Sequence, residues 1–221
     1  MYNNDTGGGE VILLTGSEGS ISYSRITDNG KYGIHVKGSN LEISHSTISN
    51  NRFSNAGGGI YLMQGSTLNV ENSILYSSAY GDDFDGAEIV FSDSYDPNTA
   101  TISYSDVGSV ETHDNGTADF GAGYISLDPQ FVDSDNGDYS LMASSPCINS
   151  GNPDSTDEDG TIGDMGYSPY INDYSGPDWY VSTSGSDLNG TGSSESPFAL
   201  ISTALLWSSD EDIINVGPGT Y

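Results

Sequence analysis

Two clusters of aspartate in glycine-flanked loops are the residues best suited to chemistry. One lies in NPDSTDEDGTIGD (152–164) and the other in GDDFDG (81–86). Calcium ions take about six to eight oxygen ligands, often from flexible loops rich in carboxylates, so both loops are candidate Ca²⁺ sites. The predicted ligands are Asp154, Asp157, Asp159, Asp164, Asp82, Asp83 and Asp85.

Each loop also has a simpler interpretation. Residues 157–160 would form a turn in which an aspartate side chain bonds to the main chain, and the spacing is not that of an EF-hand, which ends in Glu. The aspartates of 81–86 would be solvated, or a pair of them would act as general acid and base if burial raised one pKa. The sequence leaves these alternatives open.

Basic and nucleophilic side chains are too few to suggest a catalytic site. The candidates are Arg25, Lys31, Lys37, Arg52, His35, His45 and His113. The four cations lie in or beside Asn-rich turns, as surface cations do, and the histidines have no paired catalytic context. Cys147 lies in the apolar SPCIN segment, which is typical of a buried thiol. We therefore predict no catalytic residue in this chain.

The charge balance excludes several classes of partner. The chain has 32 acidic and 4 basic residues, a formal net charge of -28, and no Lys or Arg after residue 52. Nucleic acids and anionic membrane surfaces both require basic residues, whereas divalent cations are attracted. No apolar run approaches the roughly 20 residues needed to insert into a membrane. The polar Ser/Gly/Asn/Thr composition predicts an extracellular or cell-surface location, although no signal peptide pattern follows Met1.

Aromatic residues offer a candidate carbohydrate surface, because their rings present apolar planes with polar handles. The predicted contacts are Tyr61, Tyr76, Tyr80 and Phe84. The same rings would also serve to fill and cover a narrow core, so this interpretation stays open beside the first.

Internal repeats predict the fold. Three segments align, at 21–36, 43–62 and 70–90, with a shorter copy at 102–108. The apolar anchors of the repeat are Ile26, Ile48, Ile74 and Val107. Each unit reads as short alternating strands separated by Asn, Gly and Ser corners, with no room for a long helix. Such units bury a core only by coiling and stacking. We therefore predict an all-β protein, a right-handed parallel β-helix, with coils over residues 1–116.

Longer phrases resemble a known family. GGGIYL and STLNVENSIL, within 57–75, are similar to the coils of right-handed, pectate-lyase-like β-helix proteins. The stretch 126–170 resembles the C-terminal closing segment of secreted bacterial β-helix proteins, with DPQF, GDYSL, SPCINSG and DEDGTIGDMG. Asn149 stands where that pattern usually has Asp. The resemblance implies that residues 117–170 close the β-helix.

The last part of the chain resembles the opening of the same family. Residues 179–221 follow its pattern WYVSTSGSDLNGTG…SPFALI, and 171–178 would be a linker. A short capping helix is expected, with Ser196 as N-cap and an apolar face of Ile201, Ala204 and Leu205. The order of segments implies a fragment spanning the end of one module and the start of the next. The opening segment would then dock onto the open N-terminal coil of the same chain.

The function expected from these features is non-catalytic. The resemblance implies lyases that use Arg or Lys beside Ca²⁺ and hydrolases with paired Asp and Gly-His-Gly motifs, and this chain shows neither pattern. We expect a secreted or cell-surface monomeric rod that contacts polysaccharide or cell-surface glycan, with adhesion as its role. One alternative is a fragment of a polysaccharide lyase or glycoside hydrolase whose catalytic coils lie outside this chain. Another is a purely structural stalk.

Overall fold

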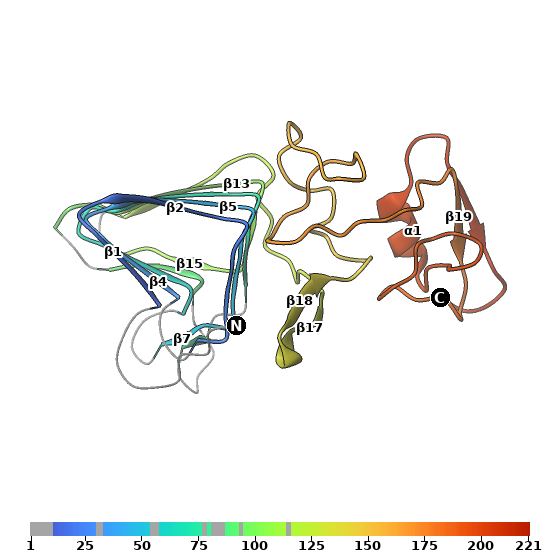
Figure 1. The fold of residues 1–221 in the computed structure, drawn as a ribbon, viewed down its shortest axis with the longest axis horizontal. Coiled ribbons are helices and arrows are strands. Elements are labelled where there is room, and N and C mark those ends of the chain that lie inside the picture. Colours follow the sequence, from blue (N-terminus) through green and yellow to red (C-terminus); the bar gives the residue numbers. More distant parts are fainter. Residues whose placement is uncertain are drawn as a thin grey trace.

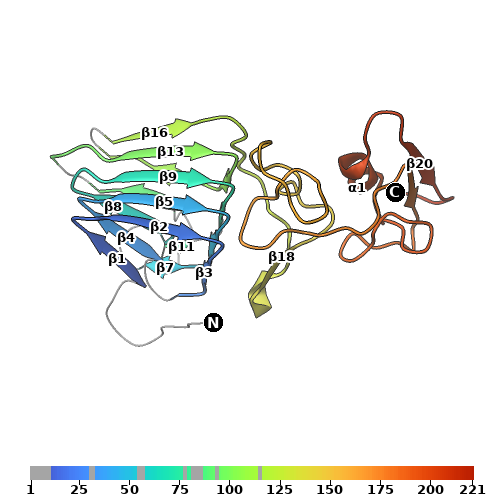
Figure 2. The same cartoon turned by 45° about the horizontal axis from the view of Figure 1, so that its top comes forward.

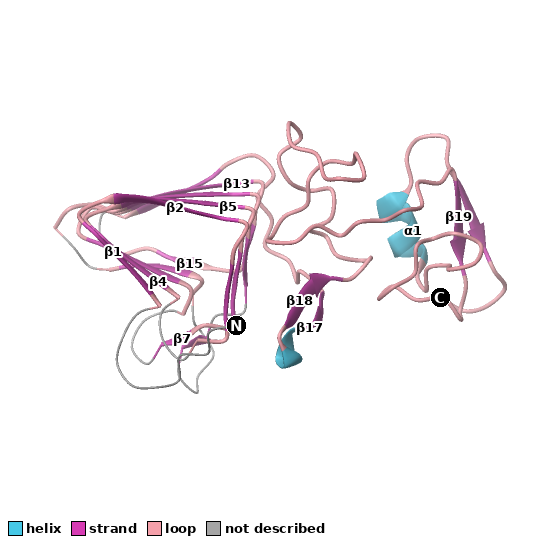
Figure 3. Cartoon of the chain, in the orientation of Figure 1, coloured by secondary structure: helices cyan, strands magenta, loops and turns pink. Residues whose placement is uncertain are grey.

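The predicted fold class is confirmed by a computed structural model of the chain. It describes residues 11–29, 33–53, 58–76, 79–80, 87–92, 95–113 and 116–221. Parallel strands stack into a coil with three faces (Figures 1 and 2), and strands and loops make up almost all of the chain (Figure 3). None of the helices within the described ranges is long and apolar enough to cross a membrane.

Three parallel sheets form the faces of the coil, and each receives one strand per turn. Sheet A contains β1 (Ile12–Thr15), β4 (Ile34–Lys37), β8 (Ile60–Met63), β12 (Ile89–Phe91) and β15 (Val110–Glu111). Sheet B contains β2 (Glu18–Ser22), β5 (Asn40–Ser44), β9 (Thr67–Glu71), β13 (Thr99–Ser103) and β16 (Thr117–Phe120). Sheet C contains β3 (Arg25–Thr27), β6 (Thr47–Ser49), β10 (Ile74–Tyr76) and β14 (Asp106–Val107). A fourth, short pair joins β7 (Arg52–Phe53) and β11 (Ala79–Tyr80).

Apolar residues stack in register inside the coil, because alternate side chains of a strand point to opposite faces. Sheet A aligns Ile12, Ile34, Ile60, Ile89 and Val110, and sheet B aligns Ile21, Ile43, Val70, Ile102 and Phe120. All of these residues except Phe120, which is 46% exposed at the end of sheet B, belong to or pack against one continuous core cluster. Because each coil contributes only a few side chains, the core depends on the stacking of neighbours.

The expected anchor at Ile74 is wrong by one residue. Sheet C pairs Ile48 with Leu75 and Leu75 with Val107, so Leu75 is the inward residue of this coil. Ile74 points out of the coil and is nevertheless buried, against Leu141 and Met165 of the later chain. Both positions are apolar because both faces of sheet C are covered.

Serine side chains hold the corner between sheets B and C. The backbone N–H of Ser24 donates to Oγ of Ser46, that of Ser46 to Ser73, and that of Ser73 to Ser105, at 3.1–3.2 Å. The preceding residue of each corner has positive φ, as His45 does at 44°. Each coil therefore turns at the same place, which keeps the three sheets aligned.

The solenoid continues beyond the expected boundary at residue 116. Strand β16 pairs with β13 along its whole length, and Ile125 forms a parallel bridge with Asp106 of sheet C. The following chain lies beside sheet C and includes the antiparallel hairpin β17 (Phe131–Asp133) and β18 (Asp138–Leu141), joined by the 3-10 turn Ser134–Asn136 (Figure 2). We call residues 126–170 the closing segment.

The outer side chains of sheet C hold the closing segment. Arg25 donates to the carbonyl of Gly137 at 2.8 Å, and Thr47 Oγ1 accepts from the backbone N–H of Tyr167 at 3.2 Å. Asp106 Oδ1 accepts from the N–H of Leu127 at 3.1 Å. Together with buried Ile74, these residues form one outward ladder across all four strands of sheet C, so the segment docks on a side of the coil.

Gly166 lets the closing segment approach sheet C closely. Its φ is 105°, and a Cβ there would lie 3.0 Å from Ile74 Cδ1 and 3.1 Å from Thr47 Oγ1. We expect Gly166→Ala to lower the free energy of unfolding by about 1–3 kcal/mol, measured by chemical denaturation. Gly160→Ala is the matched control, because Gly160 also has positive φ but open space around it. Equal costs for the two variants would show that the close approach contributes nothing.

Residues 178–221 form a small unit of their own. Strands β19 (Asp178–Val181) and β20 (Ile213–Val216) pair in parallel, and helix α1 (Ile201–Trp207) lies between them in the chain. The rings of Trp179, Phe198 and Trp207 gather in its core, at 6.1–6.3 Å between centroids.

Three expectations about this unit need correction. The helix begins at Ile201 after Leu200, with no side-chain cap, so Ser196 is not its N-cap. Its buried residues are Thr203 and Ala204, whereas Leu205 is 61% exposed. The unit packs against the closing segment, with Trp207 Nε1 donating to the carbonyl of Ala143 at 2.8 Å, and not against the N-terminal coil. Residues 171–178 take part in this packing, since Asn172 is buried and bonds to Asp159 and Thr191.

Candidate functional site

The outer face of sheet B is a broad polar surface. Its outward residues repeat across the strands because inward positions are occupied by the apolar ladders. They are Glu18, Ser20, Ser22, Asn40, Glu42, Ser44, Thr67, Asn69, Glu71, Thr99, Thr101 and Ser103. We call this surface the polar face. These residues are all acidic, amide or hydroxyl residues, so the face combines hydrogen-bond donors and acceptors with net negative charge.

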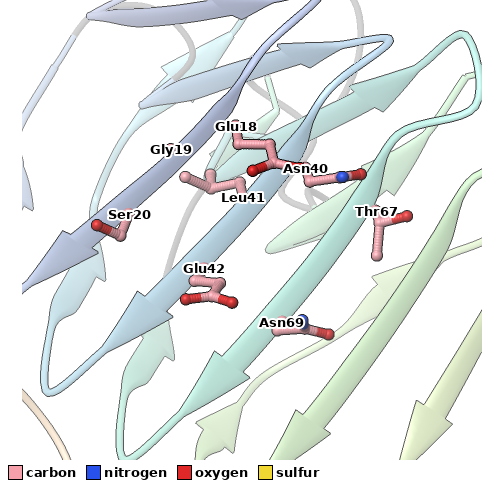
Figure 4. A pocket seen from close by; sticks show the side chains of 8 residues that line it. All are labelled: Glu18, Gly19, Ser20, Asn40, Leu41, Glu42, Thr67 and Asn69. Carbon is pink, nitrogen blue, oxygen red and sulfur yellow. The ribbon is translucent and has the colours of Figure 1, made fainter.

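Two adjoining hollows lie on the polar face. One has a volume of about 530 Å³ and lies over β2, β5 and β9, where Glu18, Asn40 and Asn69 line it (Figure 4). The other, of about 430 Å³, extends over β9 and β13 and reaches Thr101 and Ser103. They have three residues in common: Ser20, Glu42 and Asn69. The hollows therefore form one strip that crosses four strands.

The geometry of the strip suits a repeating ligand. Ser20, Glu42, Asn69 and Thr101 are direct partners on neighbouring strands, which lie about 4.8 Å apart. Neither Glu42 nor Asn69 has a side-chain hydrogen bond to any described residue, and the side chain of Asn69 is exposed. Their polar groups are therefore available to a ligand.

The predicted aspartate cluster of residues 152–164 is held together by main-chain hydrogen bonds. Asp157 Oδ2 accepts from the N–H of Asp164 at 2.8 Å, and Asp159 Oδ1 accepts from the N–H of Thr161 at 3.1 Å. Asp164 accepts from the N–H groups of Asn149 and Tyr170 at 2.7 and 2.6 Å. Asp154 is exposed. These contacts agree with the turn interpretation, and three of the four aspartates have a structural role.

Burial changes the pKa values of the aspartates in this loop. Together with the smaller effect of the nearby charges of Asp157 and Asp159, it raises the pKa of Asp164 to about 7. Burial also raises the pKa of Asp157. For Asp159 the same effect is outweighed by hydrogen bonds from Thr161 and Asn172, which lower its pKa. In the parts of the chain that the structure describes, no three His, Cys, Asp or Glu residues group as metal ligands, and Ca²⁺ binding stays a prediction.

Of the other predicted site residues, the structure describes the side chains of Tyr61 and Tyr76. Asp82, Asp83, Asp85 and Phe84 lie outside the described residues, as does the side chain of Tyr80. Tyr61 is on β8 in sheet A, and Tyr76 is on β10 in sheet C. Tyr61 lies beside His35, with ring centroids 5.3 Å apart, so Tyr61 and Tyr76 belong to different surfaces.

Sequence reasoning missed the roles of Arg25 and Asp106. Arg25 is not a simple surface cation, because its guanidinium stacks over the rings of Tyr139 and Tyr167 at 5.7 and 5.6 Å. Asp106 is fully buried, and burial raises its pKa to about 6. Its Oδ2 accepts from Cys147 Sγ at 3.4 Å. The prediction that Cys147 is a buried thiol is confirmed, and its burial beside Asp106 raises the thiol pKa.

Comparison with known proteins agrees with this architecture. Residues 1–118, more than half of the chain, match the model of a family described as the right handed beta helix region. No curated protein and no solved structure matches the chain.

Proposed function

The chain belongs to the right-handed β-helix family, and we propose that it is a non-catalytic member that contacts glycans through the polar face. Adhesion at a cell surface or outside the cell would be its role. The observation that carries the proposal is the continuous strip of Glu, Asn, Ser and Thr side chains across β2, β5, β9 and β13.

Hydrogen-bonding groups at a regular spacing suit a polymer of hydroxyl-rich units. Carboxylate and amide side chains can each accept or donate to sugar hydroxyls, and a strip without aromatic rings would bind through many weak contacts. The adjoining hollows share three residues and together cross four strands, which suits an extended chain. An extended polysaccharide is therefore a better ligand for this face than a small molecule.

The negative net charge of the protein favours a neutral glycan over an anionic one. The formal net charge is -28, and the polar face contributes Glu18, Glu42 and Glu71 without a basic residue. A neutral polysaccharide avoids electrostatic repulsion. An anionic one would need bridging cations, which is the setting in which we propose a role for Ca²⁺.

Substitution of the polar face tests the proposal. A screen of neutral polysaccharides by affinity electrophoresis would identify the ligand, and Glu42→Ala with Asn69→Ala should then weaken binding by about tenfold, because two hydrogen bonds are lost. Thr15→Ala, an exposed change on sheet A, is the control and should leave binding unchanged. If no neutral polysaccharide in the gel retards the protein, the polar face is not a glycan site. The same conclusion follows if the double variant binds as tightly as the parent, and the protein is then better regarded as a structural stalk.

A further inference from the structure

A separate hollow, away from the two on the polar face, lies between sheet C and the hairpin of the closing segment. It has a volume of about 500 Å³, within the size range of small-ligand sites. Six residues define its chemistry: Tyr76, Phe131, Asp128, Asp135, Gln130 and Asn50. We call it the hairpin groove. It is separate from the polar face, because its walls come from sheet C and from residues 128–142.

The walls of the hairpin groove are fixed by a network around Asp28. Asp28 Oδ1 accepts from Asn50 Nδ2 at 2.6 Å and from the hydroxyl of Tyr139 at 2.8 Å. The ring of Tyr139 meets Phe131 edge-on, with centroids 5.1 Å apart. These contacts tie a corner of the coil to the hairpin, so the groove is formed before any ligand arrives.

Gln130, which also lines the groove, is held in place by three further hydrogen bonds. Its backbone N–H donates to Asp128 Oδ1 at 2.9 Å, and its carbonyl accepts from the N–H of Met142 at 3.0 Å. The hydroxyl of Ser144 donates to its side-chain Oε1. The Gln130 amide is therefore held in place, while its donor group, Nε2, makes no hydrogen bond to the described residues.

The electrostatics of the groove favour a cation. Asp128 and Asp135 are exposed at its edge. Burial raises the pKa of Tyr76, and the negative charges of Asp128, Asp106 and Glu88 add to this effect. Arg25 does not line the groove; its guanidinium donates to the carbonyl of Gly137 and stacks on Tyr139. None of the residues that line the groove is Lys, Arg or His.

We propose that the hairpin groove binds an amino sugar, a saccharide unit with a protonated primary amine. The sugar ring would pack on Tyr76 and Phe131, since aromatic rings offer apolar planes to a saccharide. The ammonium group would lie between Asp128 and Asp135, with the face of Tyr76 as a further cation contact. Gln130 and Asn50 would meet the ring hydroxyls. This site does not depend on glycan binding at the polar face.

Calorimetric titration of the full chain with four short probes tests this assignment. The probes are a disaccharide of glucosamine, its N-acetylated form, a disaccharide of glucose and an aliphatic diamine. The glucosamine disaccharide should bind at least about tenfold more tightly than the other three, because only it has both the ring and the charge. Equal binding of the glucose disaccharide would overturn the electrostatic argument. Equal binding of the diamine would overturn the role of the aromatic rings.

Variants locate the site in the hairpin groove. Asp128→Asn with Asp135→Asn should weaken binding of the glucosamine disaccharide by about tenfold. The amide introduced at position 128 can still accept the hydrogen bond from the N–H of Gln130, so an unchanged melting temperature is expected. Asp173→Asn removes an exposed carboxylate of residues 171–178 and is the charge control. Binding that is unchanged in the Asp128 and Asp135 double variant, or equally weakened by Asp173→Asn, would overturn the assignment.

Discussion

Replacing Leu75 with alanine is expected to lower the free energy of unfolding by about 2–5 kcal/mol. Leu75 is fully buried and stands between Ile48 and Val107 in the inward ladder of sheet C. The neighbouring coils are fixed by their own hydrogen bonds and cannot collapse into the space left behind. The effect should be among the largest for a single side chain in the coil, and chemical denaturation monitored by circular dichroism would measure it.

Leu13→Ala is the control for this prediction, because Leu13 is on the outer face of β1 and is 55% exposed. It should change the free energy of unfolding by less than about 0.5 kcal/mol. A Leu75→Ala variant as stable as Leu13→Ala would contradict the register of sheet C.

Raising the pH from about 4 to 8 is expected to destabilise the protein, because two buried carboxyls resist ionisation. Burial raises the pKa of Asp106 to about 6 and that of Asp164 to about 7. The folded state therefore binds more protons than the unfolded state across this window. The stabilisation is complete below about pH 4 and is lost as the pH rises through the two folded-state pKa values. Each group should contribute on the order of 2–4 kcal/mol.

A matched variant separates the ionisation of these two carboxyls from that of the other titrating groups. Asp106→Asn with Asp164→Asn keeps one acceptor oxygen at each position and cannot ionise. Each aspartate accepts a hydrogen bond at both of its oxygens, so the variant loses one of these bonds at each position, at a cost that does not vary with pH. The difference in stability between parent and variant should therefore still change with pH across the window. His45, whose pKa burial lowers, acts in the opposite direction in both proteins and cancels from the difference. Asp159 and Asp212 have lowered pKa values, so the stability that they contribute is constant across this window and is lost only as the pH falls below about 4. Parallel stability curves for the two proteins would contradict the prediction.

The repeat pattern was sufficient to predict the coil but not its full register. Ile74 and Leu75 are adjacent apolar residues, so hydrophobicity alone could not assign the inward one. The serines at the corner between sheets B and C indicate which residue points inward. Each of them stands two residues before the inward residue of its coil: Ser24, Ser46, Ser73 and Ser105. Alignment on these serines selects Leu75, because a corner hydrogen bond repeats more strictly than an apolar position.

The docking of the closing segment could not be read from the sequence. Arg25, Thr47, Ile74 and Asp106 have different chemistry, and only the parallel register places them on one ladder. Each then bonds or packs to a residue about 20–120 positions away, with the longest separations at Thr47 and Arg25. No local sequence pattern marks such pairs. For this reason the sequence suggested a surface cation at Arg25 and no structural role for Asp106.

The candidate sites were predictable to different degrees. Strand alternation in 40–44 and 67–71 already implies outward Asn and Glu side chains, so the polar face follows from the repeat. The hairpin groove does not, because it requires residues 128–142 to fold back onto Tyr76. In the predicted aromatic surface, the two residues whose side chains the structure describes, Tyr61 and Tyr76, belong to different sheets of the coil.

Binding as a function of oligosaccharide length is the most direct test of the polar face as a glycan site. The strip crosses four strands, a distance of about 14 Å at the usual strand spacing. With the neutral glycan that the screen identifies, affinity should rise with length until the ligand spans this distance and then level off. In the Glu42→Ala and Asn69→Ala double variant the rise should be largely lost. Affinity that does not depend on length, or that rises equally in the parent and the double variant, would contradict the account.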